Sequence, residues 1–297
     1  MEQQYHIPVL LNECIEALDI NPDGIYVDVT FGGGGHSKEI LKYLNKGKLY
    51  AFDQDPDAAL NIPEDENLIF IPHNFGSMKN WLAFHGVSQV DGILADLGVS
   101  SHQFDTGDRG FSIRFDGPLD MRMNPNQGRS AAEWLNAAEV EEMATVLARY
   151  GEVDHPMRVA RSIHASKPIH TTMGLIEALK GLEGRGKASQ FLAQVFQALR
   201  MQVNNELGVL ESMLQQSVEL LKSNGRLVVI SYHSLEDRMV KELLRTGNVQ
   251  GELKKDFFGN IQRGMNPLKA KPILPTKEEL ERNKRSRSAK LRVGIKK

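Results

Sequence analysis

Four consecutive glycines, Gly32 to Gly35, follow a short apolar segment and precede a helical pattern. Glycine lets the backbone turn sharply and lets a ligand approach the main chain, so a run between a strand and a helix is typical of a cofactor loop. Asp28 stands just before the loop, where a carboxylate can accept hydrogen bonds from an ammonium group. A pyrophosphate would meet that negative charge, whereas the amino-acid end of S-adenosylmethionine would be held by it. The loop therefore favours S-adenosylmethionine, with a dinucleotide as the alternative.

Further candidate residues stand where apolar segments end. Asp53 comes 21 residues after Gly32, a distance at which an acidic side chain binds a ribose diol. Asp55 competes for this role, but the proline after it makes it a better helix N-cap. Asp96 ends a later segment, and Phe75 follows another and could pack against adenine. Ligands in parallel α/β folds bind beyond the carboxyl ends of strands, so one site is predicted here.

The chemistry expected at this site is methyl transfer from the sulfonium of S-adenosylmethionine. Transfer from a sulfonium is an in-line displacement, which depends mainly on holding the two reactants collinear. Asp96, or the main-chain carbonyls after it, would accept the proton that leaves the methyl acceptor, and cofactor binding is its competing role. Cys14, the only cysteine, is expected to be a buried apolar residue, which argues against chemistry that needs a cysteine nucleophile. A lone cysteine excludes a disulfide framework, and the nine histidines lack zinc-ligand spacing, so no metal is predicted.

The elements that must position these residues form an α/β pattern. Strands are expected at 25–29, 48–52, 68–71, 91–95 and 226–232, with helices at 37–44 and after 55. Strand signals stop after Ser101 for about a hundred residues, over which helices are expected at 131–150, 155–164, 173–182 and 192–221, the last broken near 204–208. The simplest organisation is a sheet domain, 1–104 and 206–297, interrupted by a helical domain, 105–205.

The net charge of −2 conceals an uneven distribution. The segment 262–297 holds 12 Lys and Arg against 3 Glu, so the rest of the chain carries −11. A basic tail on an acidic body is expected where one surface meets a polyanion, and a solvated tail that touches nothing is the alternative. Six side chains suit phosphate contacts: Arg282, Lys284, Arg285, Arg287, Lys290 and Arg292.

Several ordered blocks resemble the RsmH (MraW) family of ribosomal RNA methyltransferases over nearly the whole length. These blocks cover 6–11, 30–37, 96–105, 109–112, 116–123, 130–135, 196–200, 230–238 and 287–292, and they include the run Asp96-Leu97-Gly98-Val99-Ser100-Ser101. One segment departs from the pattern, because residues 190–194 replace a basic stretch that the family often carries. An RNA contact that other family members make through this stretch would therefore be altered in this chain.

The resemblance implies a Rossmann-like, class I S-adenosylmethionine-dependent methyltransferase fold with an inserted all-helical domain that helps to recognise the substrate. It implies N4-methylation of a cytosine in the decoding region of 16S ribosomal RNA, with the small ribosomal subunit as partner and no DNA substrate. It places cofactor contacts at Gly34, Gly35, His36, Asp53, Phe75, Asp96 and Gln103. A base in folded RNA must be flipped out, and Phe111, Phe115 and Trp134 are candidates to stack on it, although core packing is favoured for Trp134.

Two other functions use the same features. A nicotinamide-dependent oxidoreductase would use the glycine loop for a dinucleotide, and a non-catalytic assembly factor would keep S-adenosylmethionine as a ligand only. His233 is expected either to meet RNA phosphate or to support a loop. The first six residues lack the basic start and apolar stretch of a signal peptide, and no apolar run reaches the ~20 residues of a membrane span. A cytoplasmic protein is therefore expected.

Overall fold

The computed structural model describes residues 7–183 and 188–297, so His6, which opens the first block above, lies outside the described part. The chain divides into two compact units. Unit 1 combines Met1–Gly98 with Leu207–Lys297, and unit 2 is the intervening Val99–Glu206. Unit 1 is therefore discontinuous in sequence, and its two segments must meet before it can fold.

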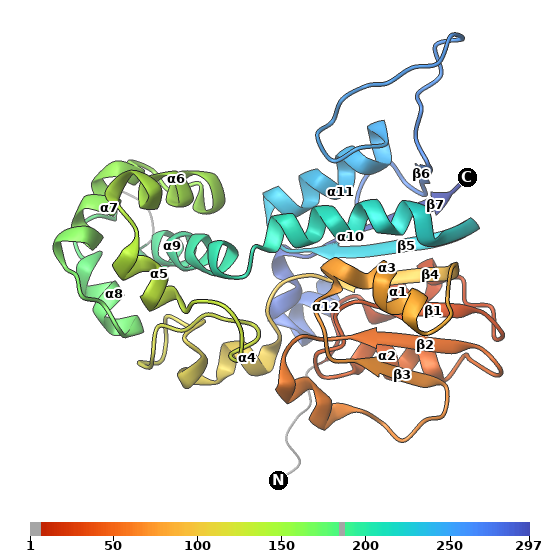
Figure 1. Ribbon diagram of the computed structural model, residues 1–297, viewed down its shortest axis with the longest axis horizontal. Helices are drawn as coiled ribbons and strands as arrows, with labels where there is room; N and C mark the ends of the chain where they lie inside the picture. The colour runs from red at the N-terminus through yellow and green to blue at the C-terminus, as the bar shows by residue number, and fades with distance from the viewer. Residues whose placement is uncertain (1–6, 184–187) are drawn as a thin grey trace. The chain divides into compact units, whose positions relative to one another are not determined.

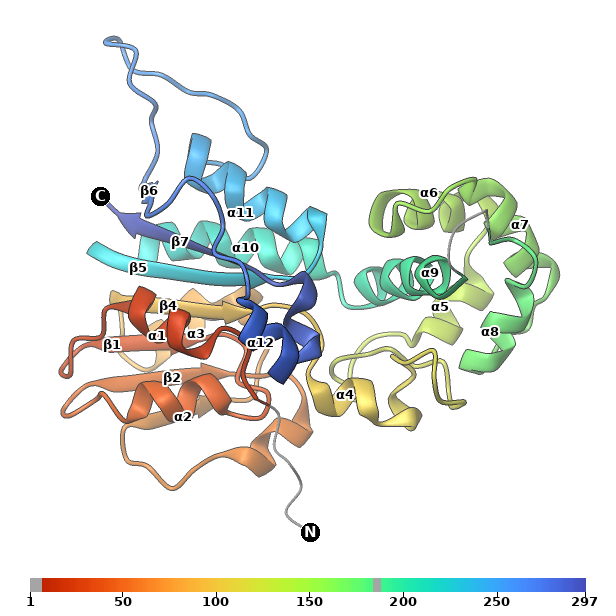
Figure 2. The same ribbon diagram turned by 180° about the vertical axis from the view of Figure 1, so that it is seen from behind.

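Unit 1 is built on a seven-stranded sheet with the order β3-β2-β1-β4-β5-β7-β6 (Figures 1 and 2). Its strands are β1 (Ile25–Asp28), β2 (Lys48–Phe52), β3 (Leu68–Ile71), β4 (Val90–Asp96), β5 (Leu221–Ser231), β6 (Met265–Pro267) and β7 (Lys290–Lys296). Strands β1 to β5 pair in parallel, whereas β7 runs antiparallel to both β5 and β6. The first five strands follow the Rossmann order, which confirms the expected α/β, Rossmann-like fold.

Side-chain alternation along the strands gives the sheet two apolar faces. Val27 and Val229 pack with α3 (Met78–Phe84), α10 (Glu206–Leu220) and α11 (Ser234–Thr246), which Figure 1 shows in front of the sheet. Leu94 and Val228 pack with α1 (Leu11–Leu18) and α2 (Gly35–Leu41), which lie in front of the sheet in Figure 2. Each fully buried Val or Leu contributes roughly 1.5–3 kcal/mol, so both faces hold the strand ends in place.

Unit 2 is helical and has a hydrophobic core of its own. Its helices are α4 (Ser101–Asp105), α5 (Ala131–Ala137), α6 (Val140–Gly151), α7 (Pro156–Ala165), α8 (Thr172–Ala178) and α9 (Ala188–Val203). The single helix expected at 131–150 is wrong, because the chain turns at Ala138, which is extended with ψ 143°. Asn136 exchanges two hydrogen bonds with the backbone of Ile169, 2.7 and 2.9 Å long, and these hold the preceding turn of α5. The departing segment 190–194 lies within α9, where Gln194 donates to the carbonyl of Glu152.

The C-terminal segment is part of the fold, so the alternative of a solvated tail that touches nothing is wrong. Besides β6 and β7 it forms α12 (Lys277–Arg282) and a 3-10 turn, Lys284–Ser288. Arg292 donates to both carboxylate oxygens of Asp237, at 2.7 and 3.2 Å, so it is not available for phosphate. Arg282, Lys284, Arg285 and Arg287 are exposed.

The second long helical pattern also ends differently from the expectation. The break near 204–208 is present, since α9 ends at Val203 and α10 begins at Glu206. Leu221 belongs to β5 instead of the helix, because it pairs with Val90 at the start of β4. Among the described residues, no helix is both long and apolar enough to cross a membrane.

Candidate cofactor and methyl-transfer site

The strand order reverses at β1, which has β2 on one side and β4 on the other. A crevice opens outside the carboxyl ends of the strands at such a switch point, and ligands bind there. Three carboxyl groups end these strands: Asp28 ends β1, Asp53 follows β2 and Asp96 ends β4. The glycine loop leaves β1 at the same edge and continues into α2.

The backbone of the loop takes conformations that suit glycine. Gly32 and Gly34 have φ values of 51° and 76°, in the left-handed region that side chains disfavour. A Cβ added at Gly33 would meet no described atom within 4 Å, so this part of the loop faces open space. The loop is fixed at Gly32, whose N–H donates to Asp53 Oδ2 at 2.7 Å and whose carbonyl accepts from Asn61.

Asp28 lies beneath the loop and is 1% exposed. Its Oδ2 accepts a 2.7 Å hydrogen bond from Ser37 Oγ, and its Oδ1 accepts one from the Thr30 N–H. Because Asp28 is buried in this way, it holds the loop and the start of α2. Our expectation that its carboxylate receives an ammonium group is therefore wrong. Its carboxyl group still disfavours a pyrophosphate over the loop.

Asp53 joins the glycine loop to the loop after β2. Its Oδ2 accepts from Gly32 and its Oδ1 accepts from the N–H of Asp55 at 2.8 Å. Burial raises the pKa of Asp53 to about 6, although these two backbone hydrogen bonds oppose the shift. Asp55 itself is buried and caps the turn Pro56–Asn61, as expected, by accepting from Asp57. Asp53 is therefore the acidic group left to face a ligand.

Phe75 begins a short turn after β3, next to the loop that carries Asp53. Asn74 caps this turn and donates from Nδ2 to Gln54 at 2.9 Å, which joins the ends of β2 and β3. Phe75 is partly buried against the sheet. Its position at a third strand end fits a flat apolar surface for an adenine ring.

Asp96 is surrounded by groups that orient its carboxylate. Tyr232 Oη donates to Oδ1 at 2.7 Å, and His36 Nδ1 lies 3.9 Å from Oδ2. The backbone N–H of Asp96 donates to Thr30 Oγ1 at 2.7 Å. Burial raises the pKa of Asp96 to about 6, against the opposing effects of His36 and the Tyr232 hydrogen bond. The side chain is 18% exposed, so it can still meet a substrate.

Sequence reasoning missed the role of Tyr232. This residue directly follows β5, which pairs with β4, so the end of β5 brings the phenol to Asp96. Burial and the negative charge of Asp96 raise the pKa of Tyr232 well above its ordinary value of 10.0, which keeps the phenol protonated as a donor. Its place as the last residue of the predicted strand 226–232 was the one available signal.

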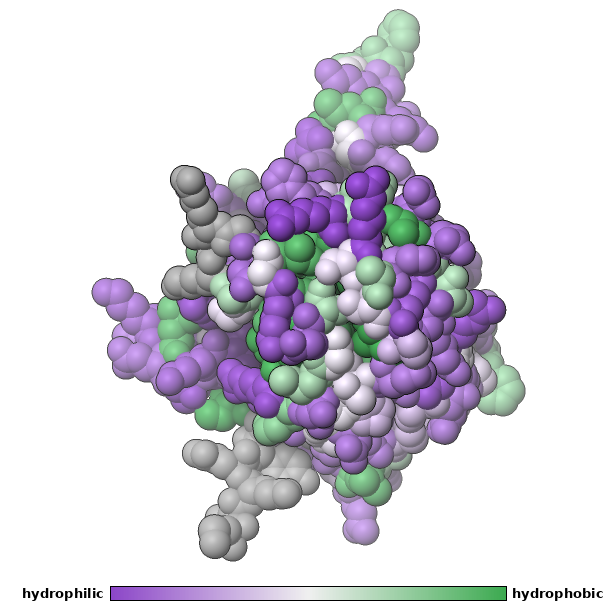
Figure 3. All heavy atoms as spheres, turned by 90° about the vertical axis from the view of Figure 1, so that its left-hand side faces the viewer, coloured by the Kyte–Doolittle hydropathy of each residue, from purple (hydrophilic) through white to green (hydrophobic). Residues whose placement is uncertain are grey.

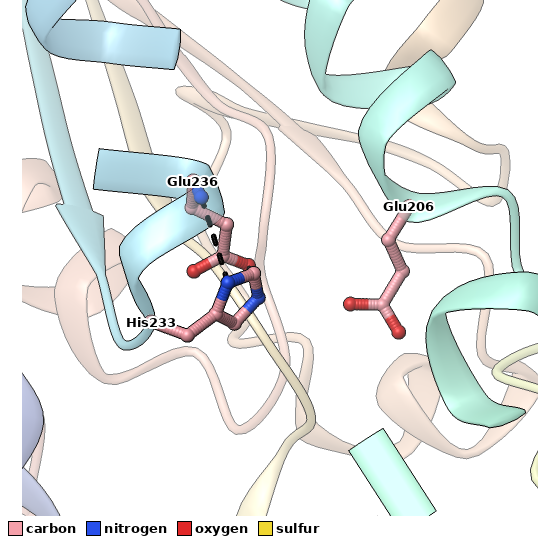
Figure 4. A group of neighbouring side chains, drawn as sticks. All are labelled: Glu206, His233 and Glu236. Carbon is pink, nitrogen blue, oxygen red and sulfur yellow. Dashed lines mark hydrogen bonds and ion pairs between the residues drawn. The ribbon is translucent and has the colours of Figure 1, made fainter. Parts of the chain in front are cut away.

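Two neighbouring residues support Tyr232. Glu236, at the start of α11, accepts from the Tyr232 N–H at 3.0 Å. His233 caps α11 by accepting a long hydrogen bond from the Glu236 N–H, drawn as the dashed line in Figure 4, and its Nε2 lies 3.0 Å from Glu236 Oε1. His233 caps its own helix and its side chain is 11% exposed, which favours the structural role of the two that we expected.

His36 and Cys14 are both buried in unit 1. His36 Nε2 lies 3.0 Å from the carbonyl of Val9, which fixes the ring against the N-terminal segment. Burial raises the pKa of Cys14 well above its usual value, so the thiol stays protonated, as expected of an apolar core residue.

The remaining candidates lie in unit 2. Gln103 is buried and forms a reciprocal capping box with Ser100 at the start of α4. Phe111 is buried in the core of unit 2, so its ring is not exposed to stack on a base. Trp134 packs partly against the same core, and Phe115 is 46% exposed.

Comparison with known proteins shows the family of this chain. The model of the MraW methylase family matches residues 3–297. A ribosomal RNA small subunit methyltransferase H of Parabacteroides distasonis is 52% identical over 297 residues, which span 98% of this chain and 97% of the relative. Proteins of the same name from Bacteroides thetaiotaomicron and Cytophaga hutchinsonii are 51% and 52% identical, over 100% and 98% of this chain and 99% of each relative. The family resemblance of the sequence is confirmed: the chain belongs to the MraW methylase family.

Proposed function

We propose that the protein transfers a methyl group from S-adenosylmethionine to the N4 amine of a cytosine in the decoding region of 16S ribosomal RNA. The observation that carries this proposal is the arrangement at the switch point, where Asp53 and Asp96 flank an open glycine loop. Membership of a methylase family supports the reaction, and the names of the relatives support ribosomal RNA as the substrate.

The residues at the switch point fit the proposed methyl donor. Asp53 would accept hydrogen bonds from the ribose hydroxyls, and Phe75 would lie against adenine. Gly33 would let the amino-acid end approach the main chain, with Gly34, Gly35 and His36 following it along the loop. Gln103, expected at the same site from the resemblance, belongs to unit 2, and its role stays a prediction.

Asp96 is proposed to receive the proton of the amine. The cytosine N4 lone pair is conjugated with the ring, so an acceptor on the N–H favours a pyramidal and more nucleophilic nitrogen. When the N–C bond forms and the C–S bond breaks, the nitrogen becomes cationic and loses a proton to the acceptor. With a pKa of about 6, Asp96 is mostly ionised at neutral pH and remains basic enough to take that proton. Tyr232 holds one oxygen, which leaves Oδ2 for the amine.

The proposed RNA partner is supported by exposed groups on both units. Lys284, Arg285 and Arg287 lie on the 3-10 turn that follows α12 of unit 1, where they would contact phosphates, whereas Arg282 is paired with Glu279 at 2.6 Å. Phe115 of unit 2 is the exposed member of the three aromatic candidates, so we assign the stacking role to it. Unit 2 is accordingly proposed to help recognise the substrate.

Two measurements separate this function from its alternatives. S-adenosylmethionine should raise the melting temperature and NAD should leave it unchanged, which would exclude the oxidoreductase. Transfer of labelled methyl to small-subunit RNA, mapped to N4 of a cytosine, would exclude the non-catalytic assembly factor. Failure of the wild-type protein to transfer label to RNA or to assembled subunits would refute the proposal.

Gly33→Ala tests the position of the cofactor itself. An added Cβ has open space around it, so the fold should keep its melting temperature. A cofactor lying against the loop would meet that methyl group, and its affinity should fall at least tenfold in calorimetry. Unchanged affinity would place the cofactor elsewhere.

A further inference from the structure

An arm of unit 1, residues 248–264, links α11 to β6 and extends away from the sheet (Figure 1, light blue). Phe257 and Phe258 at its tip are 98% and 85% exposed, and Figure 3 shows the tip as an apolar patch at the top. Their rings meet edge to face with centroids 5.6 Å apart. Removing aromatic surface from water is favourable, so two adjacent rings held in solvent indicate a binding partner.

The turn that presents these rings is held by one carboxylate. Asp256 accepts from the N–H groups of Phe258 and Asn260, both at 2.9 Å, and from Asn260 Nδ2 at 3.1 Å. These hydrogen bonds, led by that of the Asn260 side chain, lower the pKa of Asp256. Lys255 and Ile261 form an antiparallel bridge below the turn. An ordered turn therefore presents the two rings, and the Asp256 carboxylate accepts the hydrogen bonds that hold this turn.

Two lysines precede the aromatic tip in the arm. Lys254 and Lys255 are exposed, and Lys269 and Lys271 are exposed further along the chain, after β6. Between Glu252 and Lys271 the sequence carries five Lys and Arg against two acidic residues. Exposed aromatic rings next to lysines are the combination with which proteins bind single-stranded nucleic acid, because rings stack on bases and lysines neutralise phosphates. An apolar protein partner would need a broader patch than two rings among charged side chains.

We propose that the arm binds unpaired nucleotides of the RNA substrate, with Phe257 and Phe258 stacking on bases and Lys254 and Lys255 contacting the adjacent phosphates. The choice of RNA rests on the proposed function. The arm would act as a contact separate from the switch-point crevice, one that strengthens RNA binding without touching the cofactor.

The test compares the double variant F257A/F258A with F84A, which removes a 77% exposed phenylalanine from α3. The probe is a fluorescein-labelled, single-stranded 30-nucleotide RNA of the decoding region, measured by anisotropy at several salt concentrations. The double variant should bind at least tenfold more weakly with an unchanged salt slope, because stacking releases no counterions. F84A should bind within twofold of wild type. K254A/K255A should reduce the log–log salt slope by about 1.4, since each single-strand phosphate contact contributes roughly 0.7.

Three results would overturn the proposal. One is wild-type RNA affinity in F257A/F258A at an unchanged melting temperature. The others are loss of self-association in sedimentation, or loss of binding to phosphatidylglycerol vesicles, while RNA affinity stays intact; these would assign the rings to a second copy or to a lipid surface. Absence of methyl transfer by the wild-type protein would refute the proposed function alone, because RNA binding by the arm is measured without cofactor.

Discussion

Replacing Asp96 by asparagine should stabilise the folded protein at neutral pH while it slows methyl transfer. Asparagine keeps an oxygen that can accept from Tyr232 Oη, so the geometry of the site is preserved. The substitution removes an ionisable group that the fold holds in a largely buried position near His36, Asp28 and Glu236. Stability and activity should therefore change in opposite directions.

The expected size follows from the pKa of Asp96, which rises from 3.8 to about 6 on folding. A carboxyl group of this kind contributes stability that is fully present below pH 3.8 and is lost as the pH rises through 6. At about 1.36 kcal/mol per pKa unit the loss approaches ~3 kcal/mol. Because the side chain is 18% exposed, water reduces this value, and about 1–3 kcal/mol remains for the variant to recover.

The assay is thermal unfolding of the cofactor-free wild type and variant between pH 5 and pH 8. The variant's melting temperature should exceed that of the wild type by ~3–8 °C at pH 8, and the difference should shrink towards pH 5. Methyl transfer at saturating cofactor should fall by roughly 10²–10⁴, the usual contribution of a positioned proton acceptor.

Asp237→Asn is the matched control, because it also removes a largely buried carboxylate from unit 1. Burial raises the pKa of Asp237, but the hydrogen bonds and charge of Arg292 outweigh it and leave the pKa lowered. Its loss should destabilise the fold by about 2–3 kcal/mol at pH 8. A pH-independent difference for the Asp96 variant, or wild-type methyl transfer by it, would refute the reasoning.

Three further predictions concern the site and the sheet. Tyr232→Phe removes a hydrogen bond that lowers the pKa of Asp96, so the acid limb of kcat/KM against pH should move to higher pH; an unmoved limb would show that Asp96 does not control that limb. Asp53→Asn should weaken S-adenosylmethionine binding about tenfold in calorimetry without lowering the melting temperature, and unaltered affinity would remove Asp53 from the ribose site. A chain ending at Ala289 lacks β7 and should lose the cooperative unfolding transition of unit 1 in circular dichroism, whereas a native-like transition of both units would show that the sheet does not need this strand.

Local sequence patterns predicted the elements whose first and last residues are set by neighbours in sequence. The glycine loop, the apolar strand at 48–52 and the proline after Asp55 predict their structure from neighbours in sequence, and the parallel topology then collects Asp53 and Asp96 at one edge. The break of the long helical pattern between α9 and α10 was also visible in its polar residues.

The features that escaped prediction depend on contacts between distant residues. Tyr232 reaches Asp96 across 136 residues of sequence, and Asn136 meets Ile169 across 33. The charge count of the C-terminal segment gave equal weight to exposed and paired cations, although Arg292 is bound to Asp237. The apolar residues of β7 alternate with polar ones, and this period of two could have identified a strand.

The order of synthesis gives the position of β7 a particular consequence. This strand lies between β5 and β6. Close to it in sequence, Glu279 accepts a hydrogen bond from the Leu10 N–H, and Asn283 donates one to the carbonyl of Ile7. The segment before β7 therefore holds the segment before α1 in place. Unit 2 is complete in sequence well before these residues leave the ribosome, whereas unit 1 must wait for them. A chain released early would thus carry a finished helical unit beside an open sheet edge, which exposes it to aggregation and proteolysis.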